Sequence, residues 1–219
     1  MIRCALLLAL AVPVSARAEC SDVDVLARGA MAGQVEREAT IVRTDAARRG
    51  CPNPTRVCET RVLARAGDVV LMGATEGAYT CAMLVLPERE VVGWLPTSRL
   101  VALAPTVLNW DGRWVRQGAL IDIGRTYGSR LRIAGVVRPL NFLPVRGAVA
   151  PLGEIDAKVD PRGETISFTM GTTGTVPFED GEPGQCRVWM ARRGPYLVAR
   201  DNGQCGGPAV SFSGLYRRQ

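Results

Sequence analysis

Histidine is absent from the 219 residues of this sequence. Its absence removes the usual general base near neutral pH and the commonest nitrogen ligand of metal ions. Mechanisms of the Ser-His-Asp and Cys-His types are therefore excluded. A C-x-x-C pair is missing too, so a zinc site is not favoured. We expect a protein that is not an enzyme and that holds no metal and no cofactor.

A run of apolar residues long enough to cross a membrane is also missing, because crossing takes about 20 residues. The apolar run at residues 4–14 is shorter. It follows the positively charged Arg3 and precedes Ala16-Arg17-Ala18, a small-x-small cleavage site. This pattern is typical of a secretory signal peptide. We expect residues 1–18 to be removed and the mature protein to be periplasmic or secreted, with no transmembrane segment.

Lysine is nearly absent, since Lys158 is the single lysine among 27 basic residues. The formal net charge is +6, and the excess of basic residues lies in the part of the chain after residue 105. A basic surface favours anionic glycans or membrane headgroups, although solvated arginines explain the same composition. Nucleic acid is not expected as a partner, because basic and aromatic residues are not interleaved.

Cysteine is well represented, and six of the seven cysteines follow the predicted signal. An even number in an oxidising compartment suggests three disulfides, with free buried thiols as the alternative. Cys186 and Cys205 flank a predicted strand, and a bridge between them would tie neighbouring strands. The remaining four cysteines allow three pairings, of which we favour a local staple, Cys51–Cys58, and an N-terminal anchor, Cys20–Cys81.

After its first segment the chain has the residue pattern of an all-β protein. Residues 22–38 allow one short helix at most, capped by Ser21 or Asp22. Later residues form short apolar runs interrupted by Gly, Pro, Asn and Asp, which is typical of sandwiches and barrels. At residues 119–123 apolar side chains alternate with Asp122, as a half-buried strand requires. Predicted strands lie at 35–43, 58–63, 69–72, 82–86, 91–95, 100–103, 114–124, 131–137, 155–159, 165–170, 186–192, 196–200 and 209–216.

The first half resembles a bacterial Src-homology-3-like domain over about residues 34–104. The resemblance depends on three elements: a Gly-Asp turn at 67–68 that opens a strand, an aromatic at Tyr79 that begins the next, and Gly-Trp-Leu-Pro at 93–96. It implies a small, partly open barrel with an aromatic groove for extended peptides, in which Tyr79 and Trp94 are the candidate contacts. A core position for Trp94 stays open, because Gly-Trp elements often pack inward.

The second half resembles lipocalin-like and avidin-like barrels. Gly112-x-Trp114 opens a strand, and Arg217 and Arg218 come just after the last one. In those barrels the first-strand Trp packs beneath an Arg of the last strand, which implies closure of the barrel by Gly112, Trp114 and Arg217. The run from Tyr196 to the end is also similar to the C-terminal domain of uncharacterised secreted proteins from Gram-negative bacteria.

Two polar groups are candidate sites of chemistry. Paired carboxylates can hydrolyse glycosides, and the sequence offers Glu154 with Asp156 and an acidic loop at 179–182. We do not favour either, because such catalysis needs a cleft and shifted pKa values. The turn Asp201-Asn202-Gly203 is interpreted as a hairpin turn, with a backbone nest for an anion as the alternative.

We therefore expect an all-β chain with two barrels. The expected divisions are a signal peptide (1–18), an N-terminal segment (19–33), the Src-homology-3-like domain (34–104), a linker (105–109) and a lipocalin-like or avidin-like C-terminal β-barrel (110–219). The expected function is that of an exported, non-catalytic binding protein that contacts a cell-wall component, either peptide or glycan of peptidoglycan. Alternatives are a proteinaceous inhibitor of a wall-degrading enzyme and a barrel that holds a small apolar ligand.

Overall fold

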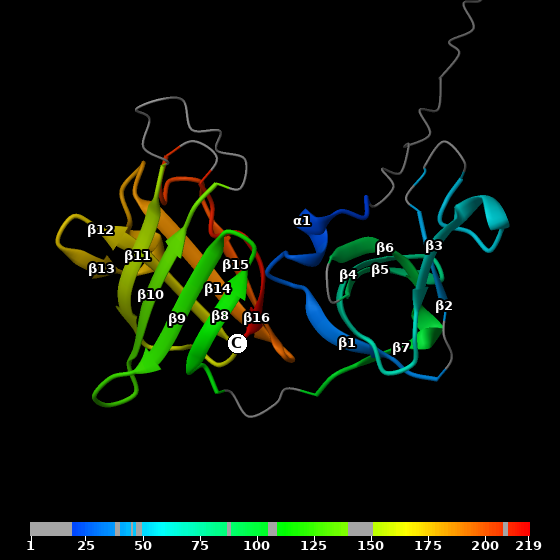
Figure 1. Cartoon of the computed structure of the whole chain (residues 1–219), viewed down its shortest axis with the longest axis horizontal. Coiled ribbons are helices and arrows are strands. Elements are labelled where there is room, and N and C mark those ends of the chain that lie inside the picture. Colours follow the sequence, from blue (N-terminus) through cyan, green and yellow to red (C-terminus); the bar gives the residue numbers. More distant parts are fainter. Residues whose placement is uncertain are drawn as a thin grey trace, which may run out of the picture.

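The computed structural model describes residues 19–37, 40–44, 46, 50–86, 89–104, 109–139, 151–207 and 210–219. The predicted signal peptide and most of the predicted linker lie outside these ranges. Within them the chain is all-β: one α-helix, α1 (Asp22–Val25), accompanies two antiparallel sheets (Figure 1). The described ranges contain no helix with the length and apolar character needed to span a membrane. The expected fold class is confirmed.

Sheet A is built from the first half of the chain and curls round on itself (Figure 1). Its strand order is β3-β2-β6-β5-β4-β1-β7. Short 3-10 helices, η2 (Arg56–Cys58) and η3 (Thr97–Arg99), precede β3 and β7. The strands are β1 (Met31–Val35), β2 (Thr40–Arg43), β3 (Glu59–Ala64), β4 (Val69–Glu76), β5 (Tyr79–Val85), β6 (Glu90–Pro96) and β7 (Leu100–Ala102).

The N-terminal part of sheet A differs from the prediction. The helix-compatible segment 22–38 yields only α1, and β1 already begins at Met31. The strand predicted at 35–43 is instead two strands, β1 and β2. The reason is tertiary: β1 lies between β4 and β7 and pairs with both, and a complete ladder outweighs local helix propensity.

Sheet B contains the second half of the chain, in the order β11-β10-β9-β8-β16-β15-β14-β12-β13. The ends of the sheet approach each other, because the Lys158 backbone N–H on β11 donates to Thr175 Oγ1 on β13 at 3.2 Å. The sheet is therefore a nearly closed barrel. Its strands are β8 (Gly112–Arg116), β9 (Ala119–Arg125), β10 (Leu131–Val137), β11 (Gly153–Val159), β12 (Thr165–Gly171), β13 (Gly174–Val176), β14 (Cys186–Arg193), β15 (Tyr196–Asp201) and β16 (Gly214–Arg218), with η4 (Phe178–Asp180) after β13.

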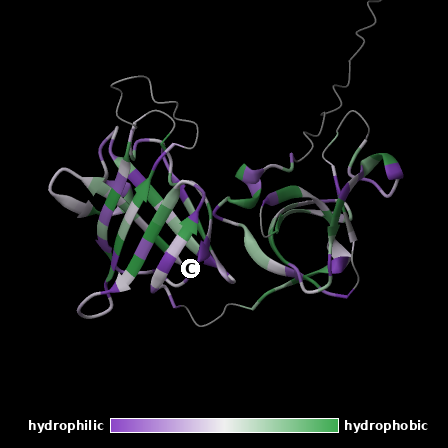
Figure 2. Ribbon diagram, viewed as in Figure 1, coloured by the Kyte–Doolittle hydropathy of each residue, from purple (hydrophilic) through white to green (hydrophobic). Residues whose placement is uncertain are grey.

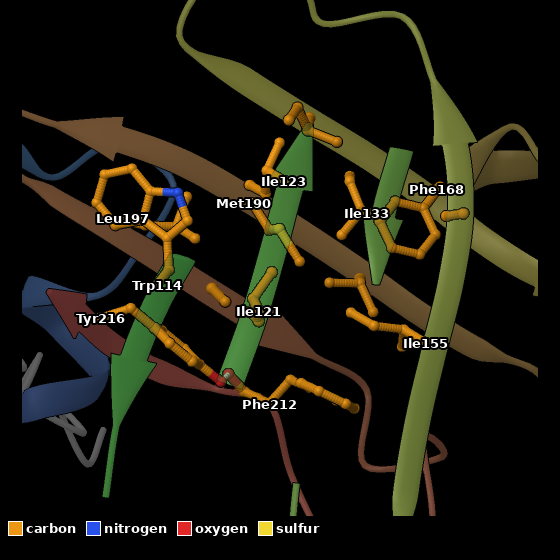
Figure 3. Packing of buried hydrophobic residues seen from close by; sticks show 14 of the residues in the cluster. Trp114, Ile121, Ile123, Ile133, Ile155, Phe168, Met190, Leu197, Phe212 and Tyr216 are labelled. Atoms are coloured by element: carbon orange, nitrogen blue, oxygen red, sulfur yellow. Dashed lines mark hydrogen bonds between the residues drawn. The ribbon is translucent and has the colours of Figure 1, made fainter. Parts of the chain in front are cut away.

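Apolar side chains fill the interior of sheet B. Along β8 to β11 hydrophobic and hydrophilic residues alternate (Figure 2), and on β9 the inward positions Ala119, Ile121 and Ile123 are buried, as predicted. Phe168 and Phe212 are fully buried in the same interior, and Phe168 lies beside Ile133 of β10 (Figure 3). The strand predicted at 114–124 is a hairpin, divided by a turn at Gln117 and Gly118.

Three disulfides are present, and they have the predicted pairings: Cys20–Cys81, Cys51–Cys58 and Cys186–Cys205. Cys81 is fully buried in sheet A, so the first bridge ties the N-terminal segment to β5. The last one connects β14 to the segment after β15. Three disulfides without a membrane-spanning helix are compatible with a periplasmic or extracellular protein.

Candidate functional site

Trp94, a candidate ligand contact, is fully buried. It faces outward from the small barrel, but that face is covered. Trp94 belongs to an apolar cluster, here called the intersheet cluster, that joins residues of α1, sheet A and sheet B. Its buried members are Val25, Leu71, Cys81, Met83, Trp94, Trp189, Ala191, Val198 and Leu215. Trp94 is therefore a core residue, which was one of the two alternatives that the sequence allowed. Its side chain cannot contact a ligand unless neighbouring segments are displaced.

Tyr79, the second candidate contact, is half-buried and packs against the same cluster. Its ring centroid lies 5.8 Å from the guanidinium carbon of Arg43. It begins β5 opposite Pro96 of β6, two positions from the Cys81–Trp94 pair. Tyr79 and Trp94 are thus near each other as predicted, but they do not line an open aromatic groove together.

The N-terminal segment fastens sheet A to sheet B. Ser21 begins α1 with a capping box to Asp24, and Val25 is fully buried against the sheets. The guanidinium carbon of Arg28 lies 4.8 Å from the centroid of the Phe178 ring, and Arg193 of sheet B donates to the Arg28 backbone carbonyl at 3.1 Å. The segment therefore contacts both sheets and fixes their spacing on this side.

Arg217 makes a second connection between the sheets, which corrects its predicted role. It was expected to stack on Trp114, but it donates to the Leu86 carbonyl and to Glu90 Oε1 at 3.4 Å, both in sheet A. Side chains alternate along β16. Leu215 and Arg217 consequently point out of the barrel, while the intervening Tyr216 points in.

Arg218 and Arg192 take the predicted place of Arg217 at the barrel end. Their guanidinium carbons lie 5.9 Å and 4.5 Å from the centroid of the fully buried Trp114 ring. Burial lowers the pKa of Arg192, and the adjacent charge of Arg218 lowers it further. Gly112 leaves room for this arrangement, because a Cβ there would lie 2.7 Å from Arg218 Nε. Gly112 and Trp114 therefore lie together at the barrel end, beside Arg192 and beside Arg218, one of the two arginines that the sequence indicated.

A groove of about 1090 Å³ lies between α1, sheet A and sheet B, beside the intersheet cluster. We call it the intersheet groove. One wall comes from α1 and sheet A and the other from β8, β15 and β16. Its lining residues are Asp22, Val23, Leu26, Met83, Glu90, Val92, Val115, Arg116, Gln117, Arg200, Ser213, Gly214, Leu215 and Arg217.

Two arginines of the sheet B wall have no carboxylate partner among the described residues. Arg116 donates to the backbone carbonyls of Gln117, at 3.2 Å, and Ser211, and its guanidinium carbon lies 5.4 Å from the Tyr216 ring centroid. These partners are neutral. The Arg200 side chain is half-buried and makes no ion pair or hydrogen bond to the described part of the chain. Through Arg200 the wall therefore presents uncompensated positive charge to the groove.

Gly214 allows Arg116 to lie where it does. A Cβ at this position would be 3.0 Å from Arg116 Cδ, and the φ of +148° is one that residues with a side chain rarely adopt. Gly214 thus makes room for the Arg116 side chain over β16, which β8 and β15 flank in the sheet.

The other polar groups singled out in the sequence have structural roles. Asp156 accepts two hydrogen bonds from Arg132, each of 3.1 Å, and this pairing lowers the pKa of Asp156, whereas a catalytic acid needs a raised one.

In the 201–203 segment the Gly203 N–H donates to Asp201 Oδ1, so this backbone donor is not directed at an external anion. Asp201-Asn202-Gly203 begins a longer loop and is not the predicted hairpin turn, because the partner strand β16 begins only at Gly214. Across the described ranges, His, Cys, Asp and Glu side chains do not gather into a group that could hold a metal ion.

Comparison with known proteins returned no match to a family model, a curated protein or a solved structure. The groove must therefore be interpreted from its own geometry. Sequence reasoning missed Arg116 and Arg200 because the groove is assembled from segments far apart in the chain. One signal was available: Arg200 follows Tyr196 and Val198 on the same face of β15, and both of those residues belong to the intersheet cluster.

Tyr216, whose ring lies beside Arg116, should make the barrel less stable at alkaline pH. Burial raises the pKa of Tyr216 from 10.0 to about 12. The neutral form is favoured in the fold, so its contribution is complete below pH 10 and is lost as the pH rises through 12. We expect the free energy of unfolding to fall by about 2–3 kcal/mol across this window. Urea unfolding at a series of pH values measures it, and Tyr216→Phe should flatten the decline; an unchanged decline would place its origin elsewhere.

Proposed function

We propose that this chain is an exported, non-catalytic binding protein of the cell envelope, and that its ligand is a cell-wall component, peptide or glycan of peptidoglycan. The ligand would lie in the intersheet groove. Support comes from the disulfide-stabilised all-β fold, the signal-like pattern at residues 1–18, and the resemblance of residues 34–104 to bacterial Src-homology-3-like domains.

The observation that carries the proposal is the environment of Arg200. It is half-buried in the groove wall, where solvation is reduced, and no described carboxylate compensates its charge. An ion that is partly removed from water gains most from a partner of opposite charge. A ligand with an anionic group supplies that partner, and peptidoglycan carries such groups.

The groove is a better candidate than the barrel interior. A small-ligand barrel needs an empty interior, whereas Ile121, Ile133, Phe168 and Phe212 fill that of sheet B (Figure 3). The face of Trp94 is covered as well. The intersheet groove, by contrast, is open and lined by charged side chains from both sheets.

Sedimentation with purified peptidoglycan tests the proposal. We expect the wild type to pellet and Arg200→Glu to lose at least tenfold in affinity, because one charge-assisted hydrogen bond is worth about 1.5–3 kcal/mol. Arg61→Glu is the matched control: Arg61 is an exposed arginine on β3, outside the groove, so its variant changes the net charge equally. Equal pelleting of the two variants would remove the groove as the site, and a wild type that does not pellet would reject the function.

A further inference from the structure

The charges of the intersheet groove are divided between its two walls. Arg116 and Arg200 belong to sheet B, while Asp22, in the first turn of α1, and Glu90, on β6, belong to the opposite wall. Glu90 is already paired with Arg217 at 3.4 Å. Asp22 is exposed and, among the described residues, its carboxylate accepts only the neighbouring Val23 N–H at 3.1 Å. One wall of the groove therefore carries the unpaired cation Arg200, and the opposite wall carries the carboxylate of Asp22.

Aliphatic side chains lie on both walls of the groove. Leu26, Met83 and Val92 lie on one wall, and Val115 and Leu215 on the other. A ligand that contacts both Arg200 and Asp22 and fits this lining therefore carries an uncharged aliphatic portion besides its two charges. These groups are those of a peptide: a carboxylate, an aliphatic portion and an ammonium group.

The described residues that line the groove include no aromatic side chain. Trp94 and Trp189, the tryptophans of the intersheet cluster, are buried. Sugar rings are typically bound by stacking their apolar faces on exposed aromatic side chains, and the described lining offers no such platform. A ligand with several negative charges and no cation, such as a phosphate ester, would be repelled by the carboxylate of Asp22.

We infer that the groove binds a zwitterionic peptide, with a free carboxylate held by Arg200 and an ammonium group beside Asp22. The inference deepens the proposed function and rests on it: of the two wall components, the peptide is the ligand and the sugar chain is not. Bidentate contact from a guanidinium suits a planar carboxylate.

Isothermal titration calorimetry of the disulfide-bonded protein tests the inference with two probes. One is the synthetic stem tetrapeptide L-Ala-γ-D-Glu-meso-diaminopimelate-D-Ala, and the other is the uncharged sugar chitotetraose. We expect the wild type to bind the tetrapeptide and not the sugar. Arg200→Gln should weaken tetrapeptide binding at least tenfold and Asp22→Asn several-fold, while Arg61→Gln leaves it unchanged. Thermal unfolding of each variant verifies that the fold is intact.

The outcomes separate this inference from the proposed function. If the protein pellets with peptidoglycan but binds chitotetraose, or binds neither probe, the peptide specificity is wrong and the envelope function stands. Tetrapeptide binding that is equal in Arg200→Gln and Arg61→Gln would place the peptide outside the groove and overturn the inference. A protein that fails to pellet with peptidoglycan and also fails to bind the tetrapeptide would remove both.

Discussion

Replacement of both Cys20 and Cys81 by alanine is expected to lower the free energy of unfolding by about 4 kcal/mol. The bridge between them spans 61 residues, the longest separation of the three disulfides. Without it, the unfolded chain gains the entropy of a large open loop. Alanine is preferred to serine because Cys81 is fully buried and a hydroxyl there would need a partner. Equilibrium unfolding in guanidinium chloride measures the effect.

The matched control is the pair Cys51→Ala and Cys58→Ala. Their bridge spans seven residues, and the same loop entropy predicts a loss of about 2–3 kcal/mol. The two bridges also differ in their relation to the groove, because Asp22 and Leu26 follow Cys20 closely and line it. We expect ligand affinity to fall only when the Cys20–Cys81 bridge is removed. A larger loss of stability in the control pair would contradict the role given to the N-terminal segment.

Trp114→Ala is expected to destabilise the protein by about 3–5 kcal/mol. The side chain is fully buried at the end of the barrel, where its ring faces the guanidinium groups of Arg192 and Arg218. Removing the ring leaves a cavity and takes away the aromatic face beside two cations, one of them Arg192, which is itself buried. The free energy of unfolding, measured by guanidinium denaturation followed by circular dichroism, reports the loss.

Two further variants identify the cause of that loss. Trp114→Phe keeps a ring but removes the indole N–H that donates to the Trp110 carbonyl at 3.2 Å, so about 1–3 kcal/mol should be lost. Arg217→Ala should leave the barrel end unaffected, because Arg217 contacts Leu86 and Glu90 of sheet A. If Arg217→Ala cost as much as Trp114→Ala, the assignment of Arg218 and Arg192 to the barrel end would be wrong.

The intersheet cluster explains why the function is assigned to the whole chain and not to one sheet. It covers the outer face of β5 and β6, on which Trp94 lies. The groove that remains open takes one wall from each sheet. A fragment with sheet A alone would therefore expose Trp94 and lose Arg200, and its binding properties would differ from those of the intact protein.

Local residue patterns were sufficient for most of the strands. The alternation of small or aliphatic residues with polar ones predicted β9, β10 and β11, because a strand points successive side chains to opposite faces wherever it lies. The six cysteines after residue 18 and the signal-like pattern predicted three disulfides, and of the three pairings that Cys20, Cys51, Cys58 and Cys81 allow, the favoured one is observed. The helix was predicted too long, because its tail pairs with strands that are distant in sequence.

The sequence by itself determined an all-β chain with three bridges, since strand periodicity and cysteine number are local or countable properties. The tertiary structure alone decided which face of each strand meets another part of the chain. It buried Trp94, turned Arg217 toward sheet A, and brought Asp22, Arg116 and Arg200 to one groove. These outcomes depend on how the two sheets pack against each other. The contacts that set this packing join residues far apart in the sequence, so no local residue pattern predicts them.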